Sequence, residues 1–221
     1  MLIVPALLES NIDSLSYQIK RLSPYFNRFQ IDIADGVYVS NKTIQTKEIL
    51  ELLTNSQSPI TNNLSFDFHL MVQNYESDLQ LLQEYKNRIN IGYVLIHSSL
   101  SPDYSLLTTK YSLSIGLVVN FEERISELAL KYPLSAIPAI QIMSVQPGFQ
   151  GSSFIPEAVN KIEQLRNAGY RNKILLDGGI NSQTIKLINN HKYLPDIICP
   201  GSFIAKSTDI KSAITQLTRT L

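Results

Sequence analysis

The sequence predicts an α/β protein with a (β/α)8 TIM barrel, in one domain that spans residues 1–221. Short apolar runs recur along the chain at intervals that are too long for hairpins and fit strand–helix units. Most of these runs are continuous rather than alternating in polarity, as expected for strands that are buried on both faces of a parallel sheet. The segments between them carry helical spacing, and eight such units in 221 residues fit a barrel near the short end of its size range.

The expected strands are read from the apolar runs themselves. They are Leu2–Leu7, Phe29–Ile33, Phe66–Leu70, Tyr93–His97, Ile115–Val119, Ile140–Val145, Lys173–Leu176 and Asp196–Cys199. An apolar stripe at helical spacing follows the first run, with Ile12, Leu15, Ile19 and Leu22 on one face. The main alternative is a doubly wound open sheet. The number of strands favours the barrel, and no Gly-x-Gly-x-x-Gly motif follows the first strand.

Composition limits the partners and the setting of the protein. Lys and Arg total 19, Asp and Glu also total 19, and no stretch concentrates one sign of charge. Nucleic acid or an anionic membrane surface would require a basic excess, so we expect neither as a partner. A single cysteine, Cys199, excludes an intramolecular disulfide framework. The apolar opening segment, residues 1–8, is too short for a secretory signal, so we expect a reducing, cytoplasmic setting.

A barrel places its reactive groups at the carboxyl ends of its strands, where the βα loops begin. Asp32 and Asp35 lie at the end of the second expected strand, His69 ends the third, His97 ends the fourth, and Asp177 follows the seventh. An Asp-Gly pair alone is more often a turn than a catalytic site, and a lone strand-end histidine is more often a hydrogen-bonded structural residue. The combination of these residues at one end of a barrel nevertheless indicates an active site.

Glycine-rich loops follow the last three strands. Gly178-Gly179 comes after the seventh strand, Gly201-Ser202 after the eighth, and Gly148 and Gly151 flank a loop after the sixth. Barrels commonly bind phosphate at the loops after strands seven and eight, through backbone N–H groups and a helix N-terminus. We therefore expect a phosphate site here, and we expect Met143 to line the same pocket.

Asp32 and Asp177 belong to strands on different sides of the ring, so their carboxylates could approach one substrate from opposite faces. Such a pair can remove a proton from one face of a carbon and return a proton to the other, which inverts its configuration. The carbon must lie beside a carbonyl, and a divalent cation would stabilise the resulting enediolate. Asp32, His69 and Asp177 are candidate ligands for Zn, Mn, Fe or Co.

Six strings of residues, in order along the chain, resemble the motifs of one family. They are Val4-Pro5-Ala6-Leu7-Leu8, Gln30-Ile31-Asp32-Ile33-Ala34-Asp35-Gly36, Phe68-His69-Leu70-Met71-Val72, Met143-Ser144-Val145-Gln146-Pro147-Gly148-Phe149-Gln150-Gly151, Leu176-Asp177-Gly178-Gly179-Ile180 and Gly201-Ser202. The chain resembles the ribulose-phosphate 3-epimerases over nearly its whole length. The resemblance implies a (β/α)8 barrel that interconverts D-ribulose 5-phosphate and D-xylulose 5-phosphate, and it leaves a homo-oligomer open.

The same resemblance implies roles for individual residues. Asp32 and Asp177 match the family's acid and base, which also bind the metal, and His69 matches a further ligand. The glycine loops and Ser202 match its phosphate site. Five residues depart from the family pattern. Gln30 stands in place of a metal-binding histidine, Ala6 in place of a serine and Ala34 in place of a methionine. In the loop after the sixth strand, Gln146 replaces a glutamate and Gln150 replaces a glycine. A glutamine amide oxygen can ligate a divalent ion, but it is a poorer ligand than imidazole for zinc-like metals.

Three functional hypotheses remain open at the level of sequence. The first is an active epimerase for ribulose 5-phosphate with an altered metal site. The second is a non-catalytic relative that binds a phosphorylated sugar. The third is a 3-epimerase of another ketose phosphate, such as a hexulose 6-phosphate. All three expect a small phosphorylated ketose as the ligand.

Overall fold

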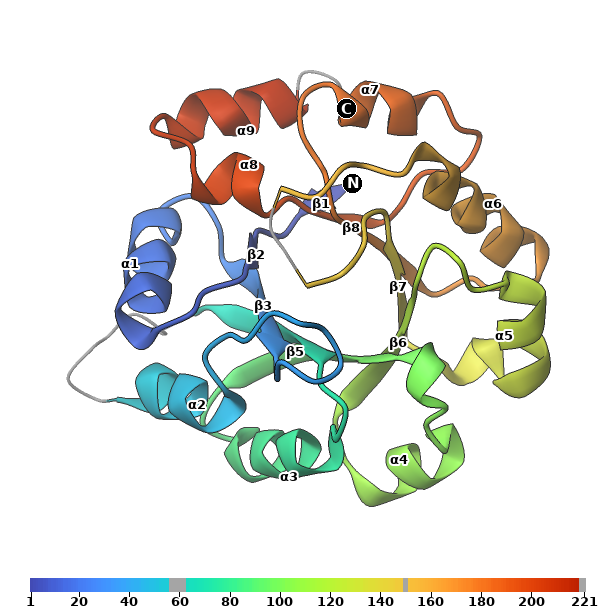
Figure 1. Ribbon diagram of the computed structural model, residues 1–221, viewed down its shortest axis with the longest axis horizontal. Coiled ribbons are helices and arrows are strands. Elements are labelled where there is room, and N and C mark those ends of the chain that lie inside the picture. The colour runs from blue at the N-terminus through green and yellow to red at the C-terminus, as the bar shows by residue number, and fades with distance from the viewer. Residues whose placement is uncertain (56–62, 149–150, 219–221) are drawn as a thin grey trace.

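The computed structural model of the protein describes residues 1–55, 63–148 and 151–218. In this part of the chain, nine strand segments form one parallel sheet in the order β1-β9-β8-β7-β6-β5-β4-β3-β2. They are β1 Leu2–Ile3, β2 Ala6–Leu7, β3 Arg28–Ala34, β4 Ser65–Met71, β5 Asn90–His97, β6 Ser114–Val119, β7 Ala139–Met143, β8 Lys173–Asp177 and β9 Ile197–Cys199. Figure 1 looks down the curled sheet, with the helices arranged around it. This is the predicted (β/α)8 barrel.

The ring closes through the first strand, because β1 pairs with β9 and β2 pairs with β3. The sequence predicts one continuous strand over Leu2–Leu7, whereas the structure divides it at Val4 and Pro5. Proline has no N–H to donate to a ladder, which explains the break. The Pro5 carbonyl still accepts from the Gln30 N–H at 2.9 Å, and the Val4 N–H donates to the Ile198 carbonyl at 3.0 Å. The two segments therefore act as one strand of the ring.

Helices connect successive strands, as parallel pairing requires. They are α1 Ile12–Leu22, α2 Thr46–Thr54, α3 Glu76–Tyr85, α4 Tyr104–Lys110, α5 Ile125–Lys131, α6 Asn160–Asn167, α7 Thr184–Asn189, α8 Ser202–Ala205 and α9 Ile210–Thr218. In α1 the predicted apolar stripe is buried apart from its first member, Ile12, which is 39% exposed. The Asn11 side chain caps this helix by accepting from the Ser14 N–H at 2.9 Å.

The alternation of side chains along each strand divides the interior into two layers. On β3, Phe29, Ile31 and Ile33 face outward and pack with the helices in the larger apolar core. Gln30 and Asp32, on the other face of the same strand, are also buried. A smaller apolar cluster that includes Val4, Ala6, Leu95, Val118, Ala139, Met143, Val145, Leu175, Ile197 and Cys199 fills the rest of the barrel interior. The barrel is therefore a packed core in which a few polar side chains are embedded.

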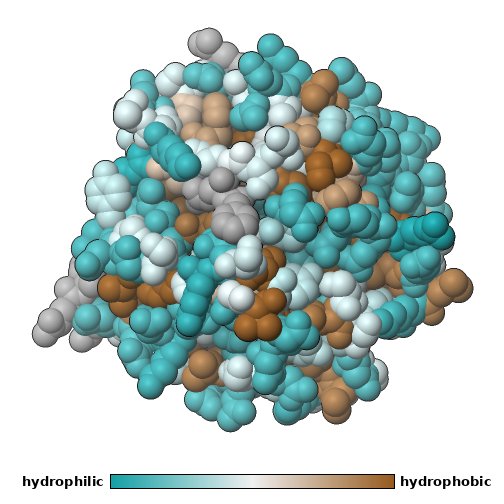
Figure 2. All heavy atoms as spheres, viewed as in Figure 1, coloured by the Kyte–Doolittle hydropathy of each residue, from teal (hydrophilic) through white to brown (hydrophobic). Residues whose placement is uncertain are grey.

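The outer surface is mixed in character. On the face shown in Figure 2, polar residues predominate and apolar residues are scattered among them. Within the described ranges, no helix has the length and apolarity that a membrane span requires.

Candidate active site

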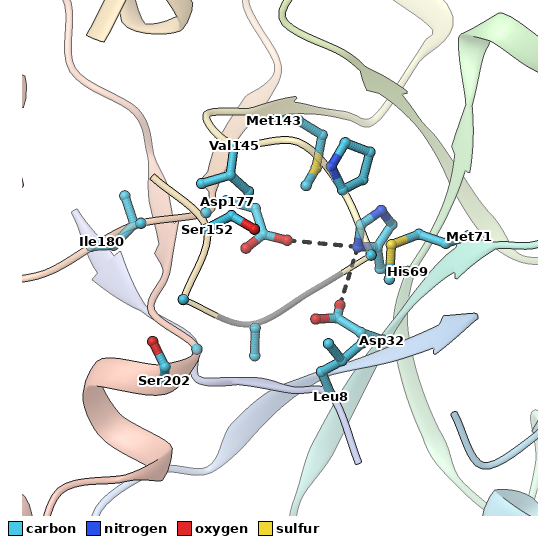
Figure 3. A pocket seen from close by; sticks show the side chains of 17 residues that line it. Leu8, Asp32, His69, Met71, Met143, Val145, Ser152, Asp177, Ile180 and Ser202 are labelled. Atoms are coloured by element: carbon cyan, nitrogen blue, oxygen red, sulfur yellow. Dashed lines mark hydrogen bonds and ion pairs between the residues drawn. The ribbon is translucent and has the colours of Figure 1, made fainter. Parts of the chain in front are cut away.

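Three side chains from different strands converge inside the barrel. Asp32 comes from β3, His69 from β4 and Asp177 from β8. Asp32 and His69 are register partners on neighbouring strands, and His69 Nδ1 lies 3.1 Å from Asp32 Oδ1 and 3.6 Å from Asp177 Oδ2. All three are buried, and one ligand atom from each lies within 4.8 Å of the others. Figure 3 shows both carboxylates facing the same nitrogen of the imidazole, with a dashed line from each.

Two glutamine amides hold this group together. Gln30 Nε2 donates to Asp32 Oδ1 at 2.8 Å and to Asp177 Oδ2 at 2.7 Å. Gln141, on β7, donates from its own Nε2 to Asp177 Oδ2 at 2.9 Å. Both glutamines are fully buried. One oxygen of Asp177 therefore accepts two amide hydrogen bonds, which lowers the energetic cost of placing two carboxylates so close together.

A second histidine supports the first. His69 Nε2 lies 3.0 Å from His97 Nε2, and the two rings tilt by 31° at a centroid separation of 5.1 Å. Burial, together with the nearby His69, lowers the pKa of His97 well below its usual value. His97 is therefore neutral, and the two Nε2 atoms can share one hydrogen bond. Donation from His69 Nε2–H would direct the lone pair of His69 Nδ1 toward the carboxylates. His97 has a positioning role and does not line the cavity.

The electrostatics of the centre favour a carboxyl group that can exchange its proton near neutral pH. Burial first, and then the charge of Asp32, raise the pKa of Asp177 to about 7. His69, the Gln30 amide and the Gly178 N–H act in the opposite direction and limit the rise. A carboxyl group in this range can both accept and return a proton at physiological pH.

The convergent residues lie in a cavity that encloses about 520 Å³ of empty space, part of it open to solvent. Every residue that the sequence predicts for catalysis, metal ligation or phosphate binding lines this cavity, except Gln30. These lining residues are Asp32, His69, Asp177, Met143, Gly148, Gly151, Gly178, Gly179, Gly201 and Ser202. Residues 149–150, which include the predicted Gln150 departure, lie outside the described residues. Ser202 opens α8 beside the cavity, as Figure 3 shows.

The loop after β8 requires glycine at two successive positions. Gly178 and Gly179 have φ values of 110° and 66°, in the region that side chains other than glycine rarely adopt. A Cβ on Gly178 would also stand 2.4 Å from Val145 Cγ2, and one on Gly179 would stand 2.8 Å from Phe154 Cβ. The backbone of this loop therefore packs closely against the loop after β7, and its two glycines add no side chain to the cavity wall.

Some residues that the sequence singles out do not line the cavity. Both carboxylate oxygens of Asp35 accept backbone hydrogen bonds, from the N–H groups of Val37, Tyr38 and Gln73 at 2.7 to 2.8 Å. Asp35 therefore shapes a turn and does not line the cavity. Of the family departures, Ala6 lines the cavity, whereas Ala34 is fully buried outside its lining.

Sequence reasoning missed Gln141. It lies in the middle of an apolar strand, so periodicity gives it no special place. The available signal was its spacing, because Gln141 and Met143 are two residues apart on one strand and therefore share a face.

The residues present fit a divalent ion. Asp32, His69 and Asp177 offer two carboxylates and one imidazole at compatible separations. Gln30 Oε1 is buried and has no hydrogen-bond partner among the described residues. A half-turn of the Gln30 amide would direct this oxygen toward the same centre, in the place now taken by Nε2.

The fold and the site together define a class of protein: a (β/α)8 barrel with a carboxylate–imidazole centre and glycine loops at its carboxyl end. Solved barrels share the fold. The tryptophan synthase A-subunit from Pyrococcus furiosus has a TM-score of 0.65 at 12% identity, with 99% of this chain and 97% of that chain covered. A 3-hexulose-6-phosphate synthase from Salmonella typhimurium has the same TM-score at 10% identity, with coverage of 100% and 98%.

Sequence comparison identifies the family. The chain belongs to the ribulose-phosphate 3 epimerase family, whose model matches residues 2–204. It is 30% identical to the ribulose-phosphate 3-epimerase of Helicobacter pylori over 221 residues, which covers 97% of this chain and 95% of that protein. It is 26% identical to the enzyme of the same name from Methanocaldococcus jannaschii over 218 residues, with coverage of 96% and 87%.

Proposed function

We propose that this protein is an isomerase that interconverts D-ribulose 5-phosphate and D-xylulose 5-phosphate by proton transfer at C3. One observation carries the proposal: a single amide nitrogen bridges two buried carboxylates, from β3 and β8, within a cavity whose wall includes glycine loops. Relatives that are named ribulose-phosphate 3-epimerase, and that match the chain over nearly its whole length, support the choice of substrate.

In the proposed reaction, Asp32 and Asp177 act on opposite faces of C3. One carboxylate removes the proton from this carbon, which is acidified by the neighbouring C2 carbonyl. The other carboxyl group donates a proton to the opposite face, so the configuration at C3 inverts and no other bond changes. The raised pKa of Asp177, about 7, suits both directions because the group can be protonated or ionised at neutral pH.

The glycine loops would hold the phosphate of the substrate. Gly178 and Gly179, with Gly201 and Ser202, offer backbone and hydroxyl groups on one side of the cavity. Gly148 and Gly151 border the same space. Met143 packs beside the reactive centre and would contact the carbon skeleton of the sugar.

A divalent cation fits the same centre. Asp32, His69 and Asp177 would hold it, with Gln30 Oε1 as a further ligand, and this set of oxygen atoms with one imidazole suits Zn, Mn, Fe or Co. When bound, the ion supplies positive charge that stabilises the negative charge on the substrate oxygens as the C3 proton leaves. His97 would keep the His69 ring in the tautomer that ligation requires.

The test is turnover of ribulose 5-phosphate by the parent and by Asp177→Asn, with Asp13→Asn as the matched control. We expect Asp177→Asn to lose about 10²- to 10⁴-fold in kcat, the usual contribution of a general acid–base group. Asp13→Asn should retain parental turnover because Asp13 is exposed on α1 and lies outside the cavity lining. Equal turnover by the parent and Asp177→Asn would refute the assigned role.

Two further measurements separate the alternatives. Faster turnover of a hexulose 6-phosphate than of ribulose 5-phosphate would identify another ketose phosphate as the substrate. Tight binding of ribulose 5-phosphate without exchange of its C3 proton for solvent deuterium would identify a non-catalytic binding protein.

A further inference from the structure

Gln141 is a buried polar residue in the middle of an apolar strand, and neither the proposed ion site nor the proposed reaction uses it. It lies within β7, faces the barrel interior and has no exposure to solvent. Its immediate neighbours along the strand, Ile140 and Ile142, belong to the outer apolar core. An amide at such a place must gain from its contacts, because burying an unpaired amide costs free energy.

Two of the three contacts of Gln141 Nε2 are with groups that would bind an ion, and the third is with Met143 Sδ at 3.6 Å. Its Nε2 donates to Asp177 Oδ2 at 2.9 Å and lies 3.3 Å from His69 Nδ1. Its Oε1, by contrast, is buried and has no hydrogen-bond partner among the described residues. The amide is therefore held through its N–H groups, which point at the carboxylate and the imidazole.

These N–H groups compete with a cation. A neutral imidazole nitrogen has one lone pair, so His69 Nδ1 cannot accept from an amide and ligate an ion at the same time. The positive end of the amide dipole also faces the region where positive charge would be added. An ion that enters this site must break the contacts of Gln141 or turn its amide.

We propose that Gln141 lowers the affinity of the Asp32–His69–Asp177 site for divalent ions by occupying lone pairs that the ion would need. In this arrangement Gln141 sets ion affinity as a donor. Ligation through its Oε1 after a half-turn of the amide, as considered for Gln30, would instead raise Kd in the Gln141 variants. The consequence of the donor role is an exchangeable ion, whose occupancy follows the free ion concentration in the surroundings. The inference rests on the ion site of the proposed function and does not depend on the proton-transfer step.

The opposite role, support of the ligands, predicts the opposite result. Amides that donate to a ligating carboxylate often support the ligand, and their removal weakens ion binding. The contact with His69 Nδ1 distinguishes the two roles, because a supporting group would leave the ligating nitrogen free. The two roles predict opposite changes in affinity, so one measurement decides between them.

The experiment measures Mn²⁺ binding to the chelator-stripped full chain by isothermal titration calorimetry. The variants are Gln141→Leu and Gln141→Met, and the second keeps the length and volume of the side chain in case the first does not fold. We expect Kd to fall about tenfold or more in both, as fits the loss of one hydrogen bond to a charged group. The Mn²⁺-induced rise in unfolding temperature should increase in the same variants, because tighter binding stabilises the folded state more.

Gln80→Leu, on the exposed face of α3, is the matched control and should leave Kd unchanged. An unchanged or larger Kd in the Gln141 variants would overturn the proposal. Absence of Mn²⁺ binding by the parent would overturn the ion site and this inference together. Neither result bears on the isomerase reaction, which is judged by ribulose 5-phosphate turnover alone.

Discussion

The buried ion pair between Arg28 and Asp67 offers a quantitative test of how a buried charge contributes to the stability of the barrel. Arg28 Nε donates to Asp67 Oδ2 at 2.9 Å, and Arg28 Nη2 donates to Asp67 Oδ1 at 2.8 Å. The Tyr93 N–H also donates to Asp67 Oδ1, at 2.7 Å. Asp67 is completely buried, whereas the Arg28 side chain is 22% exposed at the amino end of the barrel. The perturbation we consider is Arg28→Met, which removes the guanidinium and keeps much of the apolar stem.

The expected loss of stability follows from the carboxylate that remains. Removing one partner of a buried pair leaves an uncompensated charge and costs about 3–5 kcal/mol. For a chain of this size, each kcal/mol lowers the midpoint of thermal unfolding by about 2–4 °C, so we expect a decrease of roughly 6–20 °C. Adding Asp67→Asn to Arg28→Met removes the orphaned charge and should recover much of this loss.

The loss should depend on pH with a defined sign. Burial raises the pKa of Asp67, and Arg28 opposes that rise through its hydrogen bonds and its charge. Without Arg28, the pKa of Asp67 rises further above its value of about 4 in the unfolded chain. The folded variant then loses stability as pH increases from about 4 through the raised pKa, because only the unfolded chain ionises this group freely. The difference between parent and variant should therefore be largest at neutral pH and smallest below pH of about 4.

Thermal and urea unfolding of both proteins at several pH values would measure these effects. Arg124→Met is the control, because Arg124 forms an ion pair with Glu127 in which both side chains are at least 70% exposed. Such exposed pairs contribute little to stability, so the midpoint of this variant should match that of the parent. A change in Arg28→Met no larger than that in Arg124→Met would refute the argument from burial.

Three further predictions concern the surface, the phosphate loop and the histidine pair. Asp196→Asn should lower the free energy of urea unfolding by roughly 1 kcal/mol at pH 7. Burial acts to raise the pKa of Asp196, but the pKa is lowered overall by hydrogen bonds from the Ile174 N–H and Lys173 and by the charges of Lys173 and Arg166. The difference should shrink as pH falls from about 4 through the lowered pKa of Asp196, because the folded protein then also protonates this carboxylate. Gly179→Ala should raise KM for ribulose 5-phosphate about tenfold or more through strain at positive φ, with a smaller change in kcat; an unaltered KM would contradict the phosphate assignment. His97→Leu should weaken Mn²⁺ binding about 10- to 100-fold in calorimetry, and parental affinity would show that His69 needs no partner.

Much of the fold follows from local patterns in the sequence. Continuous apolar runs predict the strands because both faces of a barrel strand are buried. The predicted boundaries differ where the backbone departs from the ladder. The first strand divides at Pro5, and the sixth predicted strand ends at Met143 rather than Val145. Apolar composition continues past Met143, but the Ser144 N–H and hydroxyl bond to the carbonyl of Asp177, which turns the chain toward the cavity.

The candidate site also follows only in part from local patterns in the sequence. Strand-end position suffices to bring Asp32, His69 and Asp177 together, because parallel strands end at the same side of the sheet. The contacts of Gln30, Gln141 and His97 depend on how far each strand is offset from its neighbours, and composition does not encode that offset. The side chains of Gln141 and Asp177 meet only because β7 and β8 pair with Met143 opposite Asp177. Polar groups within an apolar strand therefore require the register before their partners can be named.

The buried charges provide a final physical argument about the centre. Three acids are buried in the described part of the chain: Asp32, Asp67 and Asp177. Arg28 compensates Asp67 alone, so two carboxylates remain without a cationic partner of fixed charge. Amide donors reduce this cost, and the raised pKa of Asp177 allows one proton to reduce it further. The uncompensated charge equals that of one divalent cation. A divalent ion would balance the charge of these two carboxylates, and a proton held by one of them would reduce it by half. The proposed reaction uses both: the ion stabilises charge on the substrate, and the proton moves between the acids and C3.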